Sequence, residues 1–205
     1  MGVSLWIVPD EKEADKLDRI IAIRPDNTST ISPASYPKFH PHITLASLPL
    51  EYKDKLDVIE TSIPKSGVPL KCSFTSVDIG SHYFRSVYVT IKPTAELDSL
   101  HKRVHESLAV NPRTPVFPHM SLCYIDDIDA ATGQRLRFYE ELKKEGKISY
   151  NDDISGHEII SLNCGAFGDK ELLSHFGAYE VWAVLCEGPV ESWEVLRKFS
   201  FITKS

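Results

Sequence analysis

Two short motifs place an imidazole and a hydroxyl at matched positions. The first reads PHITLASL and contains His42 and Thr44, and the second reads PHMSLCYI and contains His119 and Ser121. Residues i and i+2 of a β-strand point to the same face. Each motif is therefore expected to present its histidine and its hydroxyl on one surface. The proline before each histidine restricts the backbone to conformations that suit the entry to a strand.

These groups suit the cleavage of a phosphodiester. Two imidazoles that titrate near neutrality can divide the work, because one takes a proton from water while the other protonates the departing oxygen. Hydroxyls of Thr44 and Ser121 would donate hydrogen bonds to the non-bridging phosphate oxygens, where charge gathers in the transition state. We expect His42 and His119 to be catalytic, with no metal and no cofactor. The motifs are symmetric, so the order of acid and base stays open.

The remaining histidines give little support for a metal site. His40 stands two residues before His42, but no third and fourth ligand is recognisable nearby. His101 and His105 are one helical turn apart, a spacing that zinc sites use. They lack a suitable partner, and a solvated helix edge is the expected role.

The same order of elements occurs in both halves of the chain: strand, helix, loop, Pro-His strand, helix, strand. The two motif histidines are 77 residues apart, which indicates a lobe of that size repeated once. Expected strands cover 4–8, 41–48, 68–79, 86–91, 118–125, 159–167 and 179–186, with helices following 10, 50, 94 and 130 and a short terminal segment around Trp193. Thr94 is the expected N-cap of the third helix. The segment 80–86 joins the halves, as a surface loop or as a lid over the substrate.

Composition restricts the partners. The chain has 205 residues, 42% of them hydrophobic, and a net charge of −6, so we expect a small-molecule ligand and no stable complex with nucleic acid. No apolar run reaches the roughly 20 residues that span a bilayer, and the acidic opening lacks the basic start of a secretory signal. The four cysteines form no C-x-x-C pair and are expected as buried thiols, with a regulatory disulfide as the alternative. We expect a cytoplasmic monomer that binds no membrane.

The motifs HITL and HMSL resemble those of the two-histidine (2H) phosphoesterase superfamily. With their flanks PHITLASLP and PHMSLCYID, and with the opening SLWIVPD, they look most like the plant- and fungal-type cyclic nucleotide phosphodiesterases. The resemblance implies a bilobal, duplicated α+β fold, with an antiparallel sheet in each lobe, helices on its outer side and the active site between the lobes. The expected single domain is 1–205, with lobes at about 1–80 and 86–187 and the terminal segment packing back.

The resemblance also implies an activity. It predicts hydrolysis of ADP-ribose 1″,2″-cyclic phosphate and of nucleoside 2′,3′-cyclic phosphates, the latter to 2′-phosphates. In related enzymes this hydrolysis serves the pathway that processes by-products of tRNA splicing. His42 and His119 match the catalytic histidines of the family, and Thr44 and Ser121 match its phosphate-binding hydroxyls. Two alternatives stay open. One is a 2H enzyme that joins, cleaves or trims RNA ends, and the other is a noncatalytic nucleotide- or RNA-binding module.

Two aromatic residues complete the expected site. Tyr124 matches a substrate-contacting tyrosine of the subgroup. Strand alternation places it opposite His119, so it reaches the cleft only if the strand bends or ends near Cys123. Trp6 lies on the first expected strand and is predicted to stack on a base. Packing in the core is the alternative for both.

Overall fold

The computed structural model describes residues 2–26, 29–113, 116–152, 158–166 and 169–202. Its strands are β1 Val3–Pro9, β2 Ile43–Leu48, β3 Leu70–His82, β4 Arg85–Ile91, β5 His119–Cys123, β6 Ile148–Asp152, β7 Glu158–Asn163, β8 Leu172–Leu173, β9 His175–Leu185 and β10 Glu194–Ser200. Its helices are α1 Glu11–Ile21, η1 Leu50–Asp54, α2 Leu56–Ser62, α3 Ala95–Ser107, α4 Asp127–Ala130, α5 Gln134–Lys144 and η2 Val190–Ser192. The expected α+β class is confirmed.

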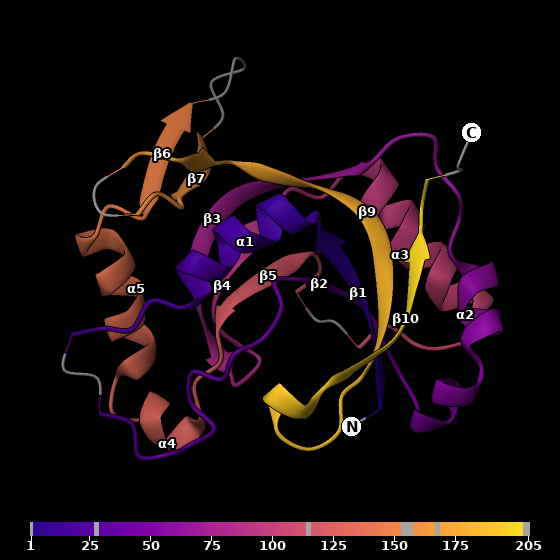
Figure 1. Cartoon of the computed structure of the whole chain (residues 1–205), viewed down its shortest axis with the longest axis horizontal. Coiled ribbons are helices and arrows are strands. Elements are labelled where there is room, and N and C mark those ends of the chain that lie inside the picture. Colours follow the sequence, from indigo (N-terminus) through magenta and orange to yellow (C-terminus); the bar gives the residue numbers. More distant parts are fainter. Residues whose placement is uncertain (1, 27–28, 114–115, 153–157, 167–168, 203–205) are drawn as a thin grey trace.

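The main strands pair in a closed ring. The order is β1–β2–β5–β4–β3–β9, all antiparallel, and β9 pairs again with β1, while β10 extends the other side of β9. Figure 1 shows α3 and α5 on opposite sides of this ring, α1 lying across its strands, and the small β6–β7–β8 sheet projecting from one corner. Each half of the chain contributes its last strand to the other half: β3 pairs with β4, and β9 pairs with β1.

Local sequence explains the two best-formed helices. Asp10 accepts a hydrogen bond from the Glu13 amide at 2.8 Å and caps α1, which buries Leu17 and Ile20 against the sheet. Thr94 caps α3 in the same way, accepting from the Leu97 amide at 3.2 Å. This confirms the expected N-cap. These caps fix where each helix begins, and burial of the apolar face fixes how it packs.

The main hydrophobic core lies between the ring strands and the helices that pack on them. Ile43 and Met120, which face each other across β2 and β5, are fully buried, as are Phe74 and Phe176 on β3 and β9. Burying such a side chain contributes about 1.5–3 kcal/mol. All four cysteines are unpaired and buried, as expected of structural thiols.

Several elements differ from the sequence-based expectation. The helix expected over 130–146 is α5, which begins only at Gln134 because Gly133 adopts a left-handed φ of 88°, and the short helix α4 that precedes it was not foreseen. The terminal segment around Trp193 continues into the strand β10, and β6 was not foreseen. The expected strand 159–167 ends at Asn163, and its last residue lies outside the described residues.

The segment 80–86 is a hairpin between two long strands. β3 continues to His82 and β4 begins at Arg85, so only two residues form the turn. Because strand pairing crosses from one half of the chain to the other, the lobe bounds at about 80 and 86 stay a proposal. Among the described helices, none has both the length and the apolar content needed to cross a membrane.

Candidate active site

The two Pro-His motifs lie side by side on neighbouring strands. The bridge between β2 and β5 joins Ile43 to Met120 in antiparallel register. Counting one residue outward from this bridge puts His42 beside Ser121 and Thr44 beside His119. Directly opposed residues in such a pair have Cβ atoms about 4.5–5.5 Å apart. The local two-fold relation of an antiparallel pair therefore superposes one motif on the other, and the four groups form a compact square.

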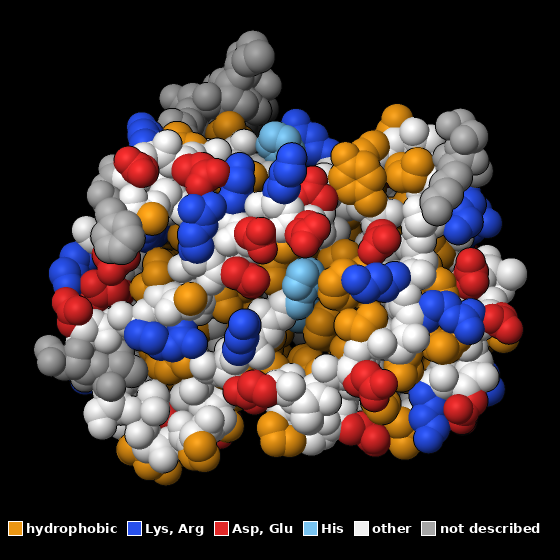
Figure 2. All heavy atoms as spheres, viewed as in Figure 1, with side chains coloured by type: hydrophobic (Ala, Val, Ile, Leu, Met, Phe, Trp, Pro, Cys, Tyr) orange, Lys and Arg blue, Asp and Glu red, His pale blue; other side chains and the backbone are white. Residues whose placement is uncertain are grey.

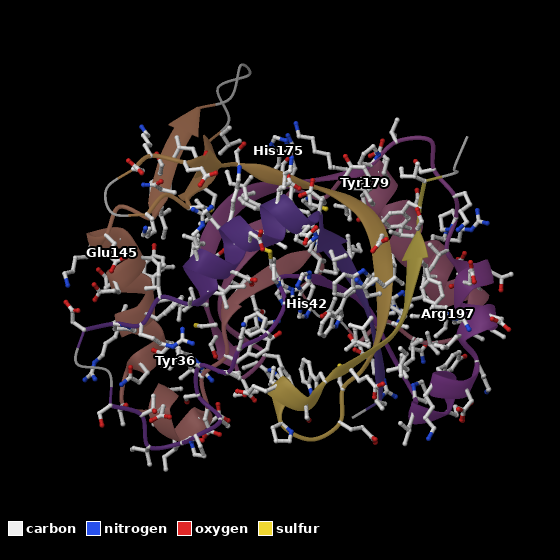
Figure 3. All side chains as sticks on the ribbon, viewed as in Figure 1. Tyr36, His42, Glu145, His175, Tyr179 and Arg197 are labelled. Carbon is white, nitrogen blue, oxygen red and sulfur yellow. The ribbon has the colours of Figure 1, made fainter. Side chains whose placement is uncertain are left out.

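All six residues expected from the sequence line one cavity of about 540 Å³. They are Trp6, His42, Thr44, His119, Ser121 and Tyr124. Figure 3 shows His42 near the centre of the ring of strands, whereas His175 and Arg197 lie at the periphery. The two imidazoles also lie close enough for the charge of His119 to lower the pKa of His42. The structure thus brings the six predicted residues together in one cavity.

Ring stacking orients the two predicted aromatic residues, Trp6 and Tyr124, in the cavity wall. Trp6 stands opposite Thr44 in the β1–β2 register, and its ring stacks on His42 with centroids 3.7 Å apart and planes 9° apart. One face of the indole is therefore covered by the imidazole. β5 ends at Cys123, which meets the condition for Tyr124 to reach the cavity. The Tyr124 ring stacks on Phe39 at 4.1 Å.

Backbone carbonyls fix the tautomer of both histidines. The Nδ1 atom of His42 lies 2.6 Å from the carbonyl oxygen of His40, and Nδ1 of His119 contacts the carbonyl oxygen of Val116. A carbonyl oxygen only accepts, so each Nδ1 carries a proton and donates it. In the neutral rings Nε2 is left with a lone pair. Nε2 is therefore the atom that can exchange a proton with a ligand.

Burial favours the neutral form of both rings. It lowers the pKa of His42 to about 3, against the favourable bond to the His40 carbonyl. Burial also lowers the pKa of His119, and the nearby Arg85 guanidinium lowers it further. A bound anion favours the charged form of a neighbouring imidazole. A phosphate in the cavity would thus raise these pKa values and supply the protonated acid that the chemistry needs.

This burial predicts a pH-dependent stability. Because the pKa of folded His42 lies below that of an exposed histidine, the unfolded chain binds a proton that the folded chain excludes. The stabilisation is complete above about pH 6.5 and is lost as the pH falls toward the folded-state value. We expect His42→Gln to flatten the decline of the unfolding free energy by up to about 1.4 kcal/mol per pH unit in this window. Urea unfolding at a series of pH values measures this slope, and equal slopes for both proteins would contradict the prediction.

The cavity is positively charged, although the protein as a whole is acidic. Its positive charge comes from Arg85 and Arg113, and among the described residues no aspartate or glutamate lines it. A second cavity lies beside α1 and is lined by several carboxylates, among them Asp15 and Asp18. Figure 2 shows acidic and basic side chains interspersed over α1, around a hollow with apolar walls. The charge at the first cavity favours an anionic ligand.

Sequence reasoning missed Trp193 in the wall, and it reached Phe84 only through the alternative that the segment 80–86 is a lid over the substrate. Phe84 and Trp193 line the cavity and lie 5.6 Å apart between ring centroids, and Phe84 also meets Tyr124 edge-on at 5.3 Å. Trp193 follows η2, far from either motif in the sequence, and no spacing rule connects it to them. Phe84 and Arg85 lie in the segment 80–86, where the aromatic and basic residues of HYFR were the available signal.

The described residues hold no cluster of three or more histidine, cysteine, aspartate or glutamate side chains suited to bind a metal ion. His101 packs against His105 and Phe117, with ring centroids 4.2 Å from each, and lines neither cavity. His40 stacks on Trp182 in the second cavity. The link from His40 to the site is its carbonyl group, which orients His42.

Antiparallel strands that carry paired histidine and hydroxyl groups into one cavity are the features of a 2H phosphoesterase, and the resemblance found in the motifs is confirmed. The chain belongs to the cyclic phosphodiesterase-like protein family, whose model matches residues 1–201. It is 28% identical to the 2′,3′-cyclic-nucleotide 3′-phosphodiesterase of Yarrowia lipolytica, with 96% of this chain and 98% of the relative covered. The enzyme of that name from Kluyveromyces lactis is 26% identical, with 96% and 97% covered.

Solved structures agree on the fold. Escherichia coli LigT, determined with 3′-AMP, aligns with a TM-score of 0.53 at 12% sequence identity and covers 98% of both chains. A second phosphoesterase aligns with a TM-score of 0.52 at the same identity and coverage. At this identity the likeness establishes the arrangement of the strands, and the chemistry rests on the residues described above.

Proposed function

We propose that this protein is a cyclic phosphodiesterase that opens nucleoside 2′,3′-cyclic phosphates to 2′-phosphates and also hydrolyses ADP-ribose 1″,2″-cyclic phosphate. The observation that carries the proposal is the square of His42, Thr44, His119 and Ser121 in a cavity without carboxylates. Membership of the cyclic phosphodiesterase-like family and the names of the fungal relatives support it. Hydrolysis by acid and base alone, without a metal, is part of the proposal.

In the proposed reaction, Nε2 of one neutral imidazole takes a proton from water as the water oxygen forms a bond to phosphorus. The bond from phosphorus to the ribose O3′ breaks, and the second imidazole, protonated at Nε2, gives its proton to O3′. The product is a 2′-phosphate. The Thr44 hydroxyl donates to a non-bridging oxygen as its charge increases. Carbonyls of His40 and Val116 orient the two rings for these transfers.

The aromatic wall is proposed to hold the nucleoside. Phe84, Trp193 and Tyr124 line the cavity beside the four polar groups, and aromatic faces bind any base by stacking. The indole Nε1 of Trp193 is buried and has no hydrogen-bond partner among the described residues, so it offers a donor to a ribose or base oxygen. We assign Trp6 to the same wall of the cavity. The face of its indole that stacks on His42 orients the His42 ring.

A side-by-side assay tests the proposed function. We expect turnover of the four nucleoside 2′,3′-cyclic phosphates and of ADP-ribose 1″,2″-cyclic phosphate, unchanged by EDTA, because two imidazoles supply both proton transfers. Phosphorus NMR should show the nucleoside products to be 2′-phosphates. A 2′-5′ linked oligonucleotide should remain intact. Cleavage of that oligonucleotide without turnover of the cyclic phosphates would favour an RNA-end enzyme, and binding without turnover would favour the noncatalytic module.

The same reasoning gives the proposed setting of the enzyme. We propose a monomer in the cytoplasm whose partner is a small cyclic phosphate and which holds no nucleic acid stably. The net charge of −6 supports the absence of long nucleic-acid partners, since these require many phosphate contacts. Four unpaired, buried thiols support a reducing compartment.

A further inference from the structure

The two motifs differ in how they use their hydroxyl protons. The Ser121 hydroxyl donates to the carbonyl oxygen of Phe84 at 2.7 Å. A serine hydroxyl has one proton, so Ser121 cannot donate to a phosphate while this bond lasts. Among the described residues the Thr44 hydroxyl makes no such bond, although both side chains line the cavity. The second motif therefore lacks the free hydroxyl donor that the first motif has.

Arg85 carries the missing donor on the residue that follows Phe84. It lines the cavity, and its Nε atom is buried without a hydrogen-bond partner among the described residues. It forms no ion pair with any described carboxylate. Its guanidinium lies over the Tyr88 ring, 5.7 Å from the centroid, and Tyr88 in turn meets His119 edge-on at 5.3 Å. A buried N–H without a partner is costly, and a ligand oxygen in this cavity would satisfy it.

The hairpin holds Arg85 in a fixed position. Gly80 packs against the Arg85 carbonyl so closely that a Cβ atom there would lie 2.0 Å from the oxygen. The buried Ser86 hydroxyl donates to the Tyr83 carbonyl at 2.9 Å and accepts from the Ile125 amide at 2.9 Å. These contacts tie the turn to the residues that follow β5. These contacts fix the backbone from which Arg85 extends, and the contact with the Tyr88 ring orients its guanidinium, as electrostatic stabilisation requires.

We propose that Arg85 is the phosphate-binding cation of the second motif and donates from its guanidinium to a non-bridging oxygen of the substrate, while Ser121 positions the hairpin through Phe84. This inference rests on the proposed function and extends it by one residue. Arg85 keeps its proton throughout, so it changes no step of the proton transfers. Arginine suits the task because its planar fork matches two phosphate oxygens, which lysine cannot do in the same way.

The Arg85→Gln variant tests the proposal. We expect kcat/KM for a nucleoside 2′,3′-cyclic phosphate to fall by about 10²–10³-fold, the usual loss for one transition-state donor. Affinity for adenosine 2′-monophosphate should fall as well, whereas affinity for adenosine, which has no phosphate, should stay within about twofold if the guanidinium contacts only the phosphate. Arg85→Lys should restore part of the activity. Arg103→Gln makes the same change on the exposed face of α3 and is expected to match the wild type.

A structural role would give a different result. Removing the guanidinium should raise the pKa of His119, because Arg85 lowers it, and the limb of the pH–rate profile that follows His119 should move to higher pH. Wild-type kinetics in Arg85→Gln, or equal losses of affinity for adenosine and its 2′-phosphate, would overturn the inference. If the wild type hydrolyses no cyclic phosphate, the proposed function fails, while the binding of the two adenosine ligands still decides whether Arg85 contacts phosphate.

Discussion

Replacing His42 with alanine is expected to lower kcat/KM for a nucleoside 2′,3′-cyclic phosphate by about 10²–10⁴-fold, the usual value of one acid or base group. His42 is only 6% exposed and lies between Trp6 and Phe39, so alanine also leaves a void. His42→Gln fills more of that volume and should be equally inactive, because an amide does not exchange a proton near neutral pH. Steady-state kinetics and a thermal melt of each variant separate chemistry from folding.

A matched control exists on the surface. His175 is exposed at the start of β9 and lines neither cavity. His175→Ala is expected to keep wild-type kcat/KM and a wild-type melting temperature. Activity within about tenfold of the wild type in both His42 variants, below the smallest loss expected for such a group, would remove His42 from the proposed mechanism.

Replacing His119 with alanine is expected to have an effect of the same size and, with His42→Ala, to show which ring is the acid. The acid matters only when the departing oxygen needs a proton. An aryl phosphodiester that releases nitrophenolate does not need one. For each alanine variant we compare the activity relative to the wild type on this substrate and on the cyclic nucleotide. In one variant this relative activity should be at least about tenfold higher on the aryl substrate, and in the other it should not change.

The recovery identifies the acid, and the variant that stays inactive identifies the base. Equal recovery of both variants, or of neither, would contradict a division of the work between the two imidazoles. The structure offers a reason for unequal rings. His42 is buried and stacked on Trp6, whereas His119 is partly exposed and lies near Arg85. Their surroundings differ although their motifs match.

Most local structure followed from short-range chemistry. The N-cap Thr94 predicted the start of α3, and the apolar spacing predicted the buried faces of α1 and α3. The strands of the two motifs were predicted from their alternation. The short helix α4 and the late start of α5 were missed because a glycine inside a helical pattern is tolerated as often as it interrupts the pattern. β10 was missed because its pairing with β9 is its main support.

The candidate site, like the fold, was predicted from the sequence only in part. Pattern and resemblance selected six residues, all of which line the cavity, because proton transfer and phosphate binding restrict the usable side chains to a few types. Tyr124 was conditional on where β5 ends, and the strand does end at Cys123. Phe84, Arg85 and Trp193 reach the cavity through a hairpin and a C-terminal turn, and their sequence positions bear no fixed relation to either histidine.

The sequence by itself determined the chemical groups, their pairing as histidine and hydroxyl, and the extended backbone that carries each pair. Only the tertiary structure decided that the two pairs meet across a single β2–β5 bridge, that the Ser121 proton is directed to Phe84, and that Arg85 faces the cavity. The physical reason is range: strand alternation acts over two residues, whereas strand register and hairpin placement depend on packing between segments that are distant in the chain.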